Sequence, residues 1–381
     1  LSKIASAGNW KAKLMTPPTP KQGIMDISPY VGGDATVDGL ANIVKLSSNE
    51  GATGASPRAI EAYKALAEEL HRYPDGGADT LRQGLAEMYG LDVNRLICGN
   101  GSDEIISHLA HAYAGPGNEV LYSEHGFLMY PLAAMANGAT PVKAPETDYT
   151  ASVDAFLAAV TEQTKLVFVA NPNNPTGTYL PQTELQRLRA GLPDDVLLVI
   201  DSAYAEFVSR NDYAPGIEMV SAHDNVVMTR TFSKIYGLAA LRLGWAYCPA
   251  EVASVFHRVR GPFNINTAAQ AAGLAALRDV NHTDEARAHN DHWLPWIMSE
   301  CDKLNLKYIP SVGNFLTIEF GTNGHRSAEA AQEFLRKKGI LPRGIAGYGL
   351  AGHLRFTVGL EDENRVTIDA LEEFLSTTDG D

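Results

Sequence analysis

The sequence predicts an α/β fold in which helices cover a mostly parallel sheet, followed by a smaller α+β domain. The chain has 381 residues, of which 45% are hydrophobic and 20% are charged, so it can build a large core. Between about residues 55 and 262, short and nearly continuous apolar runs alternate with helix-like stretches. Such runs are typical of strands that are buried on both faces. After Pro262 the pattern changes to longer helical stretches around a few short strands.

The apolar runs of the first part define the expected sheet. Because strands that alternate with helices form βαβ units, most of these strands should be parallel. The predicted strands lie at 95–98, 119–122, 165–170, 196–200, 225–229 and 244–248.

The second part begins with a helical region at 267–305, in which we expect Pro295 to mark a kink or a break. Strands at 315–320 and 353–358 follow, flanked by helices at 327–338 and 361–375. We therefore expect four parts along the chain. They are a flexible arm (1–22), an N-terminal segment that packs near the smaller domain (23–54), a large domain (55–265) and a small C-terminal domain (266–381).

Composition and charge exclude several classes of partner and location. The formal net charge of −14 disfavours a nucleic acid or an anionic membrane as partner. The cysteines Cys98, Cys248 and Cys301 are far apart and form no Cys-x-x-Cys pair, which favours a reducing compartment over a disulfide framework or a zinc site. The arm is polar, and no run of about 18 apolar residues occurs in the sequence. We expect a cytoplasmic protein without a transmembrane helix.

A lysine and an aspartate follow two neighbouring strands of the predicted sheet. The strand at 225–229 leads through hydroxyl-bearing residues to Lys234, and the strand at 196–200 leads directly to Asp201. The carboxyl ends of such strands border the crevice where α/β folds bind ligands. Taken singly, Lys234 could be a solvated loop lysine and Asp201 a helix N-cap. Together they are the pair that a pyridoxal 5′-phosphate (PLP) enzyme needs, an amine to form the imine and a carboxylate to pair with the pyridinium nitrogen.

Two further segments suit the same cofactor. Gly101, Ser102 and Asp103 follow the strand at 95–98 and open a helix, whose free N–H groups favour an anion such as the cofactor's phosphate. Many turns between a strand and a helix look like this, so the motif alone is weak. Thr231, Ser233 and Arg242 could complete a phosphate site, although Arg242 alone could be a surface arginine.

The segment 171–177 carries two prolines and three asparagines after the strand at 165–170, more than a turn requires. Together with the other motifs it resembles the fold-type I PLP-dependent aminotransferases. The matching segments, in order along the chain, are Asn174-Pro175-Thr176-Gly177, Asp201-x-x-Tyr204, Ser233-Lys234 and Arg242-x-Gly244. The resemblance covers nearly the whole chain after the arm. It implies a seven-stranded type of sheet in the large domain and a homodimer.

Within that class, four more segments are similar to those of the histidinol-phosphate aminotransferase family, at 23–30, 46–50, 72–74 and 354–359. The resemblance assigns Lys234 as the imine lysine and proton shuttle, Asp201 as the pyridinium partner, and Asn174 and Tyr204 as ligands of the ring oxygen. By the same resemblance, Phe127 should stack on the ring and Tyr73 should reach in from a partner subunit. The residues expected to hold the phosphate are Gly101, Ser102, Asp103, Thr231, Ser233 and Arg242. Those expected to bind the substrate are Arg355, Arg343, Tyr30 and Asn49.

Two departures from the family pattern concern the cofactor segments. Ser202 stands where many relatives have glutamate, at a position that is not a cofactor contact in the pattern. The stacking segment begins with His125-Gly126 rather than the commoner Pro-Thr, so Phe127 is placed by alignment to Met129-Tyr130.

Arg355 also has an argument independent of the family. Leu354, Phe356 and Val358 alternate on one face of a short strand, which leaves Arg355 on the other face. Alternation alone also fits an arginine that faces solvent.

The expected reaction is a ping-pong transamination between glutamate and the oxo form of histidinol phosphate, with 2-oxoglutarate as the other product. Three alternatives remain open at this point: an aromatic amino acid aminotransferase, a PLP-dependent lyase or decarboxylase, and a non-catalytic PLP-binding regulator. The regulator would normally carry a DNA-binding module, which neither the arm nor the net charge supplies. The histidine pairs His108/His111 and His289/His292 have helical spacing but no matching third ligand, so we expect no metal site.

Overall fold

The structure is a computed structural model that describes residues 18–21, 23–29, 32–37, 39–40 and 42–377. Most of the predicted arm (1–17 and 22) and the predicted substrate ligand Tyr30 lie outside the described residues.

A seven-stranded sheet forms the centre of the large lobe, and its order is β2-β10-β9-β8-β7-β3-β4. All neighbouring strands are parallel except β10, which is antiparallel to β2 and to β9. This agrees with the predicted α/β fold. The strands are β2 (Leu96–Gly99), β3 (Glu119–Ser123), β4 (Thr140–Ala144), β7 (Thr164–Ala170), β8 (Leu197–Asp201), β9 (Val226–Thr231) and β10 (Gly244–Tyr247).

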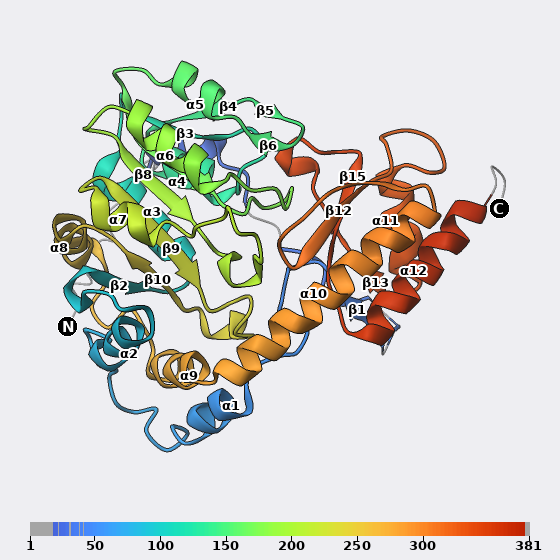
Figure 1. The fold of residues 1–381 in the computed structure, drawn as a ribbon, viewed down its shortest axis with the longest axis horizontal. Coiled ribbons are helices and arrows are strands. Elements are labelled where there is room, and N and C mark those ends of the chain that lie inside the picture. Colours follow the sequence, from blue (N-terminus) through green and yellow to red (C-terminus); the bar gives the residue numbers. More distant parts are fainter. Residues whose placement is uncertain (1–17, 22, 30–31, 38, 41, 378–381) are drawn as a thin grey trace, which may run out of the picture.

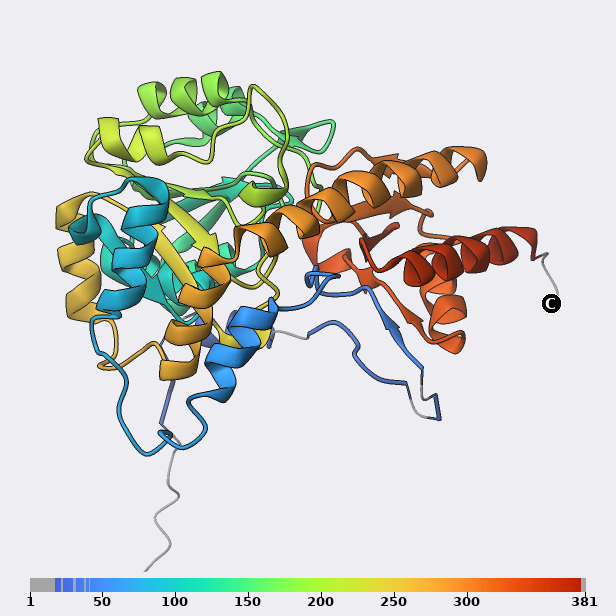
Figure 2. The ribbon, with the colours of Figure 1, turned by 60° about the horizontal axis from the view of Figure 1, so that its bottom comes forward.

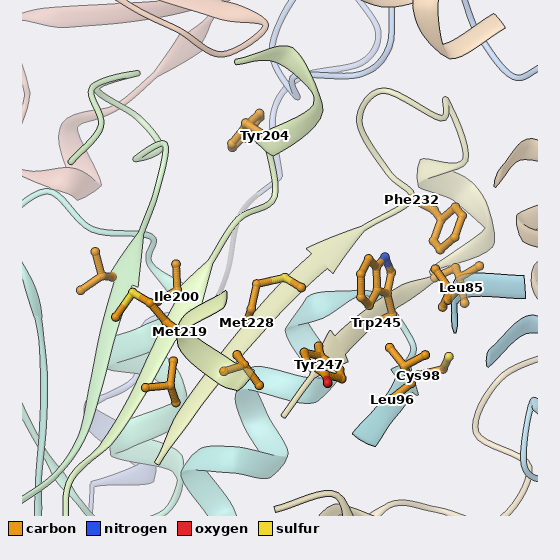
Figure 3. Close-up of a cluster of buried hydrophobic side chains, with 14 of the residues drawn as sticks. Leu85, Leu96, Cys98, Ile200, Tyr204, Met219, Met228, Phe232, Trp245 and Tyr247 are labelled. Carbon is orange, nitrogen blue, oxygen red and sulfur yellow. The ribbon is translucent and has the colours of Figure 1, made fainter. Parts of the chain in front are cut away.

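Helices cover both faces of this sheet (Figure 1). On β9, Val226 and Met228 belong to one core cluster and Val227 belongs to the other, because successive side chains of a strand point to opposite faces. Figure 3 shows the first cluster, where Met228 and Trp245 lie on the strands and Leu85 approaches from α2. Residues of α2 (Asp79–Tyr89), α5 (Val153–Ala159), α6 (Gln182–Gly191), α7 (Ile217–Ala222) and α9 (Thr267–Arg278) complete it. Residues of α3 (Ser102–Tyr113), α4 (Met129–Ala136) and α8 (Ala250–Val259) complete the second cluster.

The C-terminal lobe is built on a four-stranded antiparallel sheet of order β11-β12-β15-β14. Its strands are β11 (Lys307–Ile309), β12 (Phe315–Glu319), β14 (Arg343–Gly344) and β15 (His353–Thr357). Two helices, α11 (Ala328–Lys337) and α12 (Glu361–Ser376), contribute to its core. Near the start of the chain, β1 (Val44–Lys45) pairs in parallel with β13 (Ile340–Leu341) of this lobe.

One long helix, α10 (Val280–Lys303), connects the two lobes (Figures 1 and 2). Near its start, Arg287 donates to the carbonyl oxygen of Glu206 in the large lobe at 2.8 Å. Near its end, Trp293 and Ile297 belong to the core of the C-terminal lobe. The helical region breaks at Asp279, between α9 and α10, whereas Pro295 lies inside α10. Of the kink or break expected at Pro295, the break is therefore wrong and the kink stays a prediction.

The division of the chain at residue 265 stays a prediction. The first helix after that point, α9, packs on α1 (Pro57–Lys64) and α2 and contributes Ala272 and Ala276 to the core of the large lobe. The remaining short elements are β5 (Glu146–Thr147), β6 (Thr150–Ala151), η1 (Ile24–Asp26), η2 (Val93–Arg95), η3 (Ala205–Phe207), η4 (Ala239–Leu241) and η5 (Ala346–Tyr348). Within the described ranges, none of the helices combines the length and the apolar character that a membrane crossing requires.

Candidate active site

A cavity of about 250 Å³ lies at the carboxyl ends of β7, β8 and β9, and the C-terminal lobe supplies its opposite wall. This is the edge of a parallel sheet where ligands bind in α/β folds. The cavity brings together most of the predicted site residues: Asn49, Ser102, Asp103, Phe127, Asn174, Asp201, Tyr204, Thr231, Ser233, Lys234, Arg242, Arg343 and Arg355.

Lys234 lies in the loop that follows β9. Its Nζ donates to the carbonyl oxygen of Ser48 at 3.0 Å and lies 5.8 Å from the ring centre of Tyr204. Burial, helped by the positive charge of Arg355, lowers the pKa of the Lys234 amine to about 8. At pH 8 this raises the neutral fraction of the amine from roughly one in 300 to about half. The neutral amine is the form that acts as nucleophile or base.

Asp201 is the last residue of β8 and its side chain is buried. Its carboxylate accepts hydrogen bonds from the Tyr130 hydroxyl at 2.8 Å and from the Thr229 hydroxyl at 3.0 Å. Burial raises the pKa of Asp201 to about 6, although both hydrogen bonds oppose the shift. The carboxyl group is therefore mostly ionised at neutral pH and is oriented by two donors. It can pair with a protonated ring nitrogen.

Tyr204 is buried next to Asp201, and its hydroxyl oxygen accepts a hydrogen bond from Asn49 Nδ2 at 2.9 Å. Burial raises the pKa of Tyr204 to about 12, so the hydroxyl stays protonated and can donate. The backbone N–H of Asn49 donates to the Thr357 hydroxyl at 2.9 Å, which ties this segment to β15. Asn49 thus joins a side chain of the large lobe to the sheet of the C-terminal lobe.

An anion cradle forms where α3 begins, beside β10. Gly101 has φ 78°, and a Cβ at this position would lie 2.5 Å from Arg242 Nη2. A Cβ on residue 244 would lie 2.3 Å from the backbone nitrogen of Ser102, so both positions require glycine. Arg242 pairs with Asp103 at 3.1 Å and donates to the Ser233 hydroxyl at 3.4 Å. The helix N-terminus, two hydroxyl groups and a guanidinium group thus converge in the way that a phosphate requires.

Two arginines lie side by side in the wall that the C-terminal lobe supplies. Arg343 on β14 is the register partner of Arg355 on β15, and residues directly opposite in an antiparallel pair point to the same face. Both line the cavity. Arg355 is buried, donates to the Asn174 side-chain oxygen and donates to the Ser47 carbonyl oxygen at 2.9 Å. Such a pair of cations suits an anion with more than one charge.

Phe127 lies in the cavity wall just before α4. Its ring meets the Tyr130 ring edge to face, with centres 5.8 Å apart. An aromatic side chain in the cavity wall, in contact with the Tyr130 that holds Asp201, can stack on a flat ring.

Three predicted residues do not line the cavity. Gly101 acts through its backbone, as described above. Tyr73 is 82% exposed and stacks on Phe263, with ring centres 4.7 Å apart. Tyr30 lies outside the described residues.

Two contributors were missed. Tyr130 holds Asp201, and its only signal in the sequence was its place in the segment used to align Phe127. Tyr348 lines the cavity from η5, and its carbonyl oxygen lies 2.7 Å from His125 Nδ1, across the two lobes. Nothing local in the sequence indicates this contact, because it joins residues 223 positions apart.

Histidine, cysteine and carboxylate side chains do not gather into a group of three that could hold a metal ion, as far as the described residues show. His111 Nδ1 instead lies 2.9 Å from the Asn137 side-chain oxygen, and His289 Nε2 lies 2.9 Å from the Gly359 carbonyl oxygen.

Comparisons with known proteins agree with this geometry. The sequence model described as aminotransferase class I and II matches residues 41–371. The histidinol-phosphate aminotransferase of Paramagnetospirillum magneticum is 59% identical over 361 residues, which cover 95% of this chain and 99% of the relative. The enzyme of the same name from Rhodospirillum centenum is 55% identical with the same coverage. Among solved structures, a histidinol-phosphate aminotransferase from Sinorhizobium meliloti in complex with pyridoxal-5′-phosphate is similar, with a TM-score of 0.81 and 28% identity. That match covers 87% of this chain and 90% of the other.

Proposed function

The chain belongs to the class I and II aminotransferases, and from this premise we propose that it is a histidinol-phosphate aminotransferase. It would exchange the amino group between glutamate and the oxo form of histidinol phosphate, imidazole acetol phosphate, in histidine biosynthesis. The observation that carries the proposal is the Arg343 and Arg355 pair on one face, in the same cavity as Lys234. Relatives that share up to 59% of their residues with this chain bear the same name.

The residues of the cavity fit PLP. The cradle at the start of α3 would hold its phosphate, Asp201 its ring nitrogen, Tyr204 and Asn174 its ring oxygen, and Phe127 its ring face. The glycines at 101 and 244, which leave room at the cradle, support this fit. When bound, PLP supplies an electron-withdrawing ring that stabilises negative charge on the substrate's Cα.

Lys234 would perform the proton transfer. Because burial lowers the pKa of its amine to about 8, a useful fraction of the amine is neutral near that pH and can take the proton from the substrate's Cα. The hydrogen bond to the Ser48 carbonyl oxygen positions the amine in the cavity. Asp201, held by Tyr130 and Thr229, keeps its negative charge opposite the ring nitrogen while the proton moves.

The two arginines would bind the substrate's anion in both half-reactions. Glutamate presents a carboxylate there, whereas histidinol phosphate presents a phosphate ester with more charge and more acceptor atoms. One guanidinium group matches a carboxylate with two hydrogen bonds, and a phosphate ester leaves acceptors for a second. Arg355 would therefore serve both substrates and Arg343 mainly the phosphate.

An aromatic amino acid aminotransferase is the second candidate, since Phe127, Tyr204 and Tyr348 give the cavity aromatic walls. Spectra of the two half-reactions separate the candidates. The PLP-loaded enzyme is mixed with histidinol phosphate or with phenylalanine, and the loss of the visible band is followed. We expect faster conversion with histidinol phosphate. Much faster conversion with phenylalanine would move the assignment to the aromatic class.

The catalytic unit would be a homodimer. Tyr73 and its stacking partner Phe263 are exposed, and Tyr63 and Leu70 are 52% and 80% exposed in the same part of the large lobe. Apolar side chains gathered at a surface are typical of an interface. Tyr73 would reach the phosphate of the neighbouring subunit's cofactor.

The working compartment would be the cytoplasm. Cys98, Cys248 and Cys301 are buried as free thiols, which suits a reducing environment.

A further inference from the structure

A small cavity lies directly behind Lys234, at the junction of the two lobes. It measures about 10 Å³, which is close to the least space that one water molecule needs. The loop at 51–53 forms one wall, Ile235 another and α10 a third. The fit against the lysine loop is close, because a Cβ on residue 51 would lie 2.7 Å from the carbonyl oxygen of Lys234.

Three polar atoms in the walls of this cavity are buried and have no hydrogen-bond partner in the described part of the chain. They are Thr53 Oγ1, Asn290 Oδ1 and Asn314 Oδ1. They come from the N-terminal segment, from α10 and from the segment just before β12. A buried polar atom without a partner costs free energy, and three around one cavity call for a common partner.

The orientation of both amide groups is settled by their other hydrogen bonds. Asn290 Nδ2 donates to the Gly313 carbonyl oxygen at 3.1 Å. Asn314 Nδ2 donates to the carbonyl oxygens of Asn49 and Glu50 at 3.2 and 3.1 Å. Both nitrogens therefore have partners, and the atoms left without one are the acceptors Asn290 Oδ1 and Asn314 Oδ1, in two residues that line the cavity.

We propose that this cavity binds one structural water molecule that joins the two lobes behind Lys234. The water would donate its two hydrogens to Asn290 Oδ1 and Asn314 Oδ1 and accept one from the Thr53 hydroxyl. That arrangement satisfies all three atoms and gives the water three hydrogen bonds, the usual number for a buried water.

The proposed water matters for function because Asn314 positions the segment at 48–50, which contacts Lys234. Asn314 holds the backbone of Asn49 and Glu50, next to Ser48, whose carbonyl oxygen accepts from Lys234 Nζ. The same segment presents Asn49 to Tyr204. Asn314 is thus a positioning residue. Its Nδ2 holds the backbone of Asn49 and Glu50, and the proposed water would hold its Oδ1.

The first test is a high-resolution crystal structure of the PLP-loaded enzyme. We expect a density peak at about 2.6–3.2 Å from Thr53 Oγ1, Asn290 Oδ1 and Asn314 Oδ1. A cavity without density, or side chains rotated so that these three residues hydrogen-bond directly with one another, overturns the proposal. This result does not depend on which substrate the enzyme uses.

The second test compares Thr53→Val with Thr53→Ser. Valine has nearly the shape of threonine but lacks the hydroxyl, whereas serine keeps it. We expect Thr53→Val to lower Tm by roughly 2–4 °C relative to Thr53→Ser, and the water to be lost or displaced. Because small displacements near a reacting group are costly, kcat should also fall in Thr53→Val, by up to about 100-fold, and recover in Thr53→Ser. Equal Tm and kcat in the two variants would overturn the positioning role.

Discussion

Replacing Arg343 with alanine should affect the half-reactions of histidinol phosphate and phenylalanine unequally. Arg343 and Arg355 are opposite each other in the β14–β15 ladder, where Cβ atoms are about 4.5–5.5 Å apart, so both guanidinium groups can reach one anion. A charge-assisted hydrogen bond is worth about 1.5–3 kcal/mol, which corresponds to roughly 10- to 150-fold in affinity. Arg343→Ala should weaken the histidinol phosphate half-reaction by that factor and the phenylalanine half-reaction much less.

The assay is the single-turnover loss of the visible band at a series of substrate concentrations. Arg355→Ala should impair both substrates, because Arg355 also holds Asn174 and the Ser47 carbonyl oxygen. Arg343→Lys keeps the charge but loses the planar guanidinium group with its paired donors. Its rate with histidinol phosphate should therefore lie between those of the wild type and Arg343→Ala. Lys303→Ala is the control. It also removes one positive charge from this lobe, but the Lys303 side chain is 66% exposed, so neither half-reaction should change. Equal losses for both substrates in Arg343→Ala would refute the division of labour.

Three further predictions follow from the site and the surface. Lys234→Ala should lose both turnover and the visible band of covalently held PLP; borohydride reduction and peptide mapping check this, and a label on another lysine would contradict it. Mixing Tyr73→Phe with Lys234→Ala subunits should give more activity than either parent, because one site of each hybrid regains both groups; a fully active monomer would rule this out. Burial holds the pKa of Asp201 at about 6, above the ordinary 3.8, so the folded state keeps a proton that the unfolded state has released between those pH values. This group's contribution to stability should therefore fall by up to about 3 kcal/mol as pH rises from 4 to 6. PLP-free Asp201→Asn should lack that fall in urea unfolding, and parallel pH dependences in variant and wild type would disprove it.

The fold could be predicted where strands are buried on both faces, and less well elsewhere. The strand β4 was missed because it lies at the sheet edge, where Thr140 and Lys143 are exposed and break the apolar run. The antiparallel direction of β10 could not be predicted either, because a short apolar run has the same pattern in both directions. The helix continues through Pro295, where packing of α10 against both lobes offsets the lost hydrogen bond and the steric cost of the proline ring, whereas the break lies at Asp279.

Most of the residues that line the cavity could be named from the sequence, but their contacts could not. Short motifs identified Lys234 and Asp201, since each follows a strand at the same sheet edge. Arg343 and Arg355 lie opposite each other because of the register of β14 and β15, and no local sequence pattern predicts that register. The contact between His125 and the Tyr348 carbonyl oxygen depends on how the lobes meet. Long-range geometry of this kind arises from packing of the whole chain.

The pairing of β1 with β13 has a consequence for synthesis on the ribosome. Val44 and Lys45 find their partners at Ile340 and Leu341, almost 300 residues later in the chain. At about 5–20 residues per second, this segment waits roughly 15–60 s before its neighbour emerges. The large lobe can form during that time, but the contacts of Asn49 with Asn314 and Thr357 must wait for the C-terminal lobe. The segment before residue 50 therefore carries an unpaired strand during that interval, and this is where a chaperone would bind.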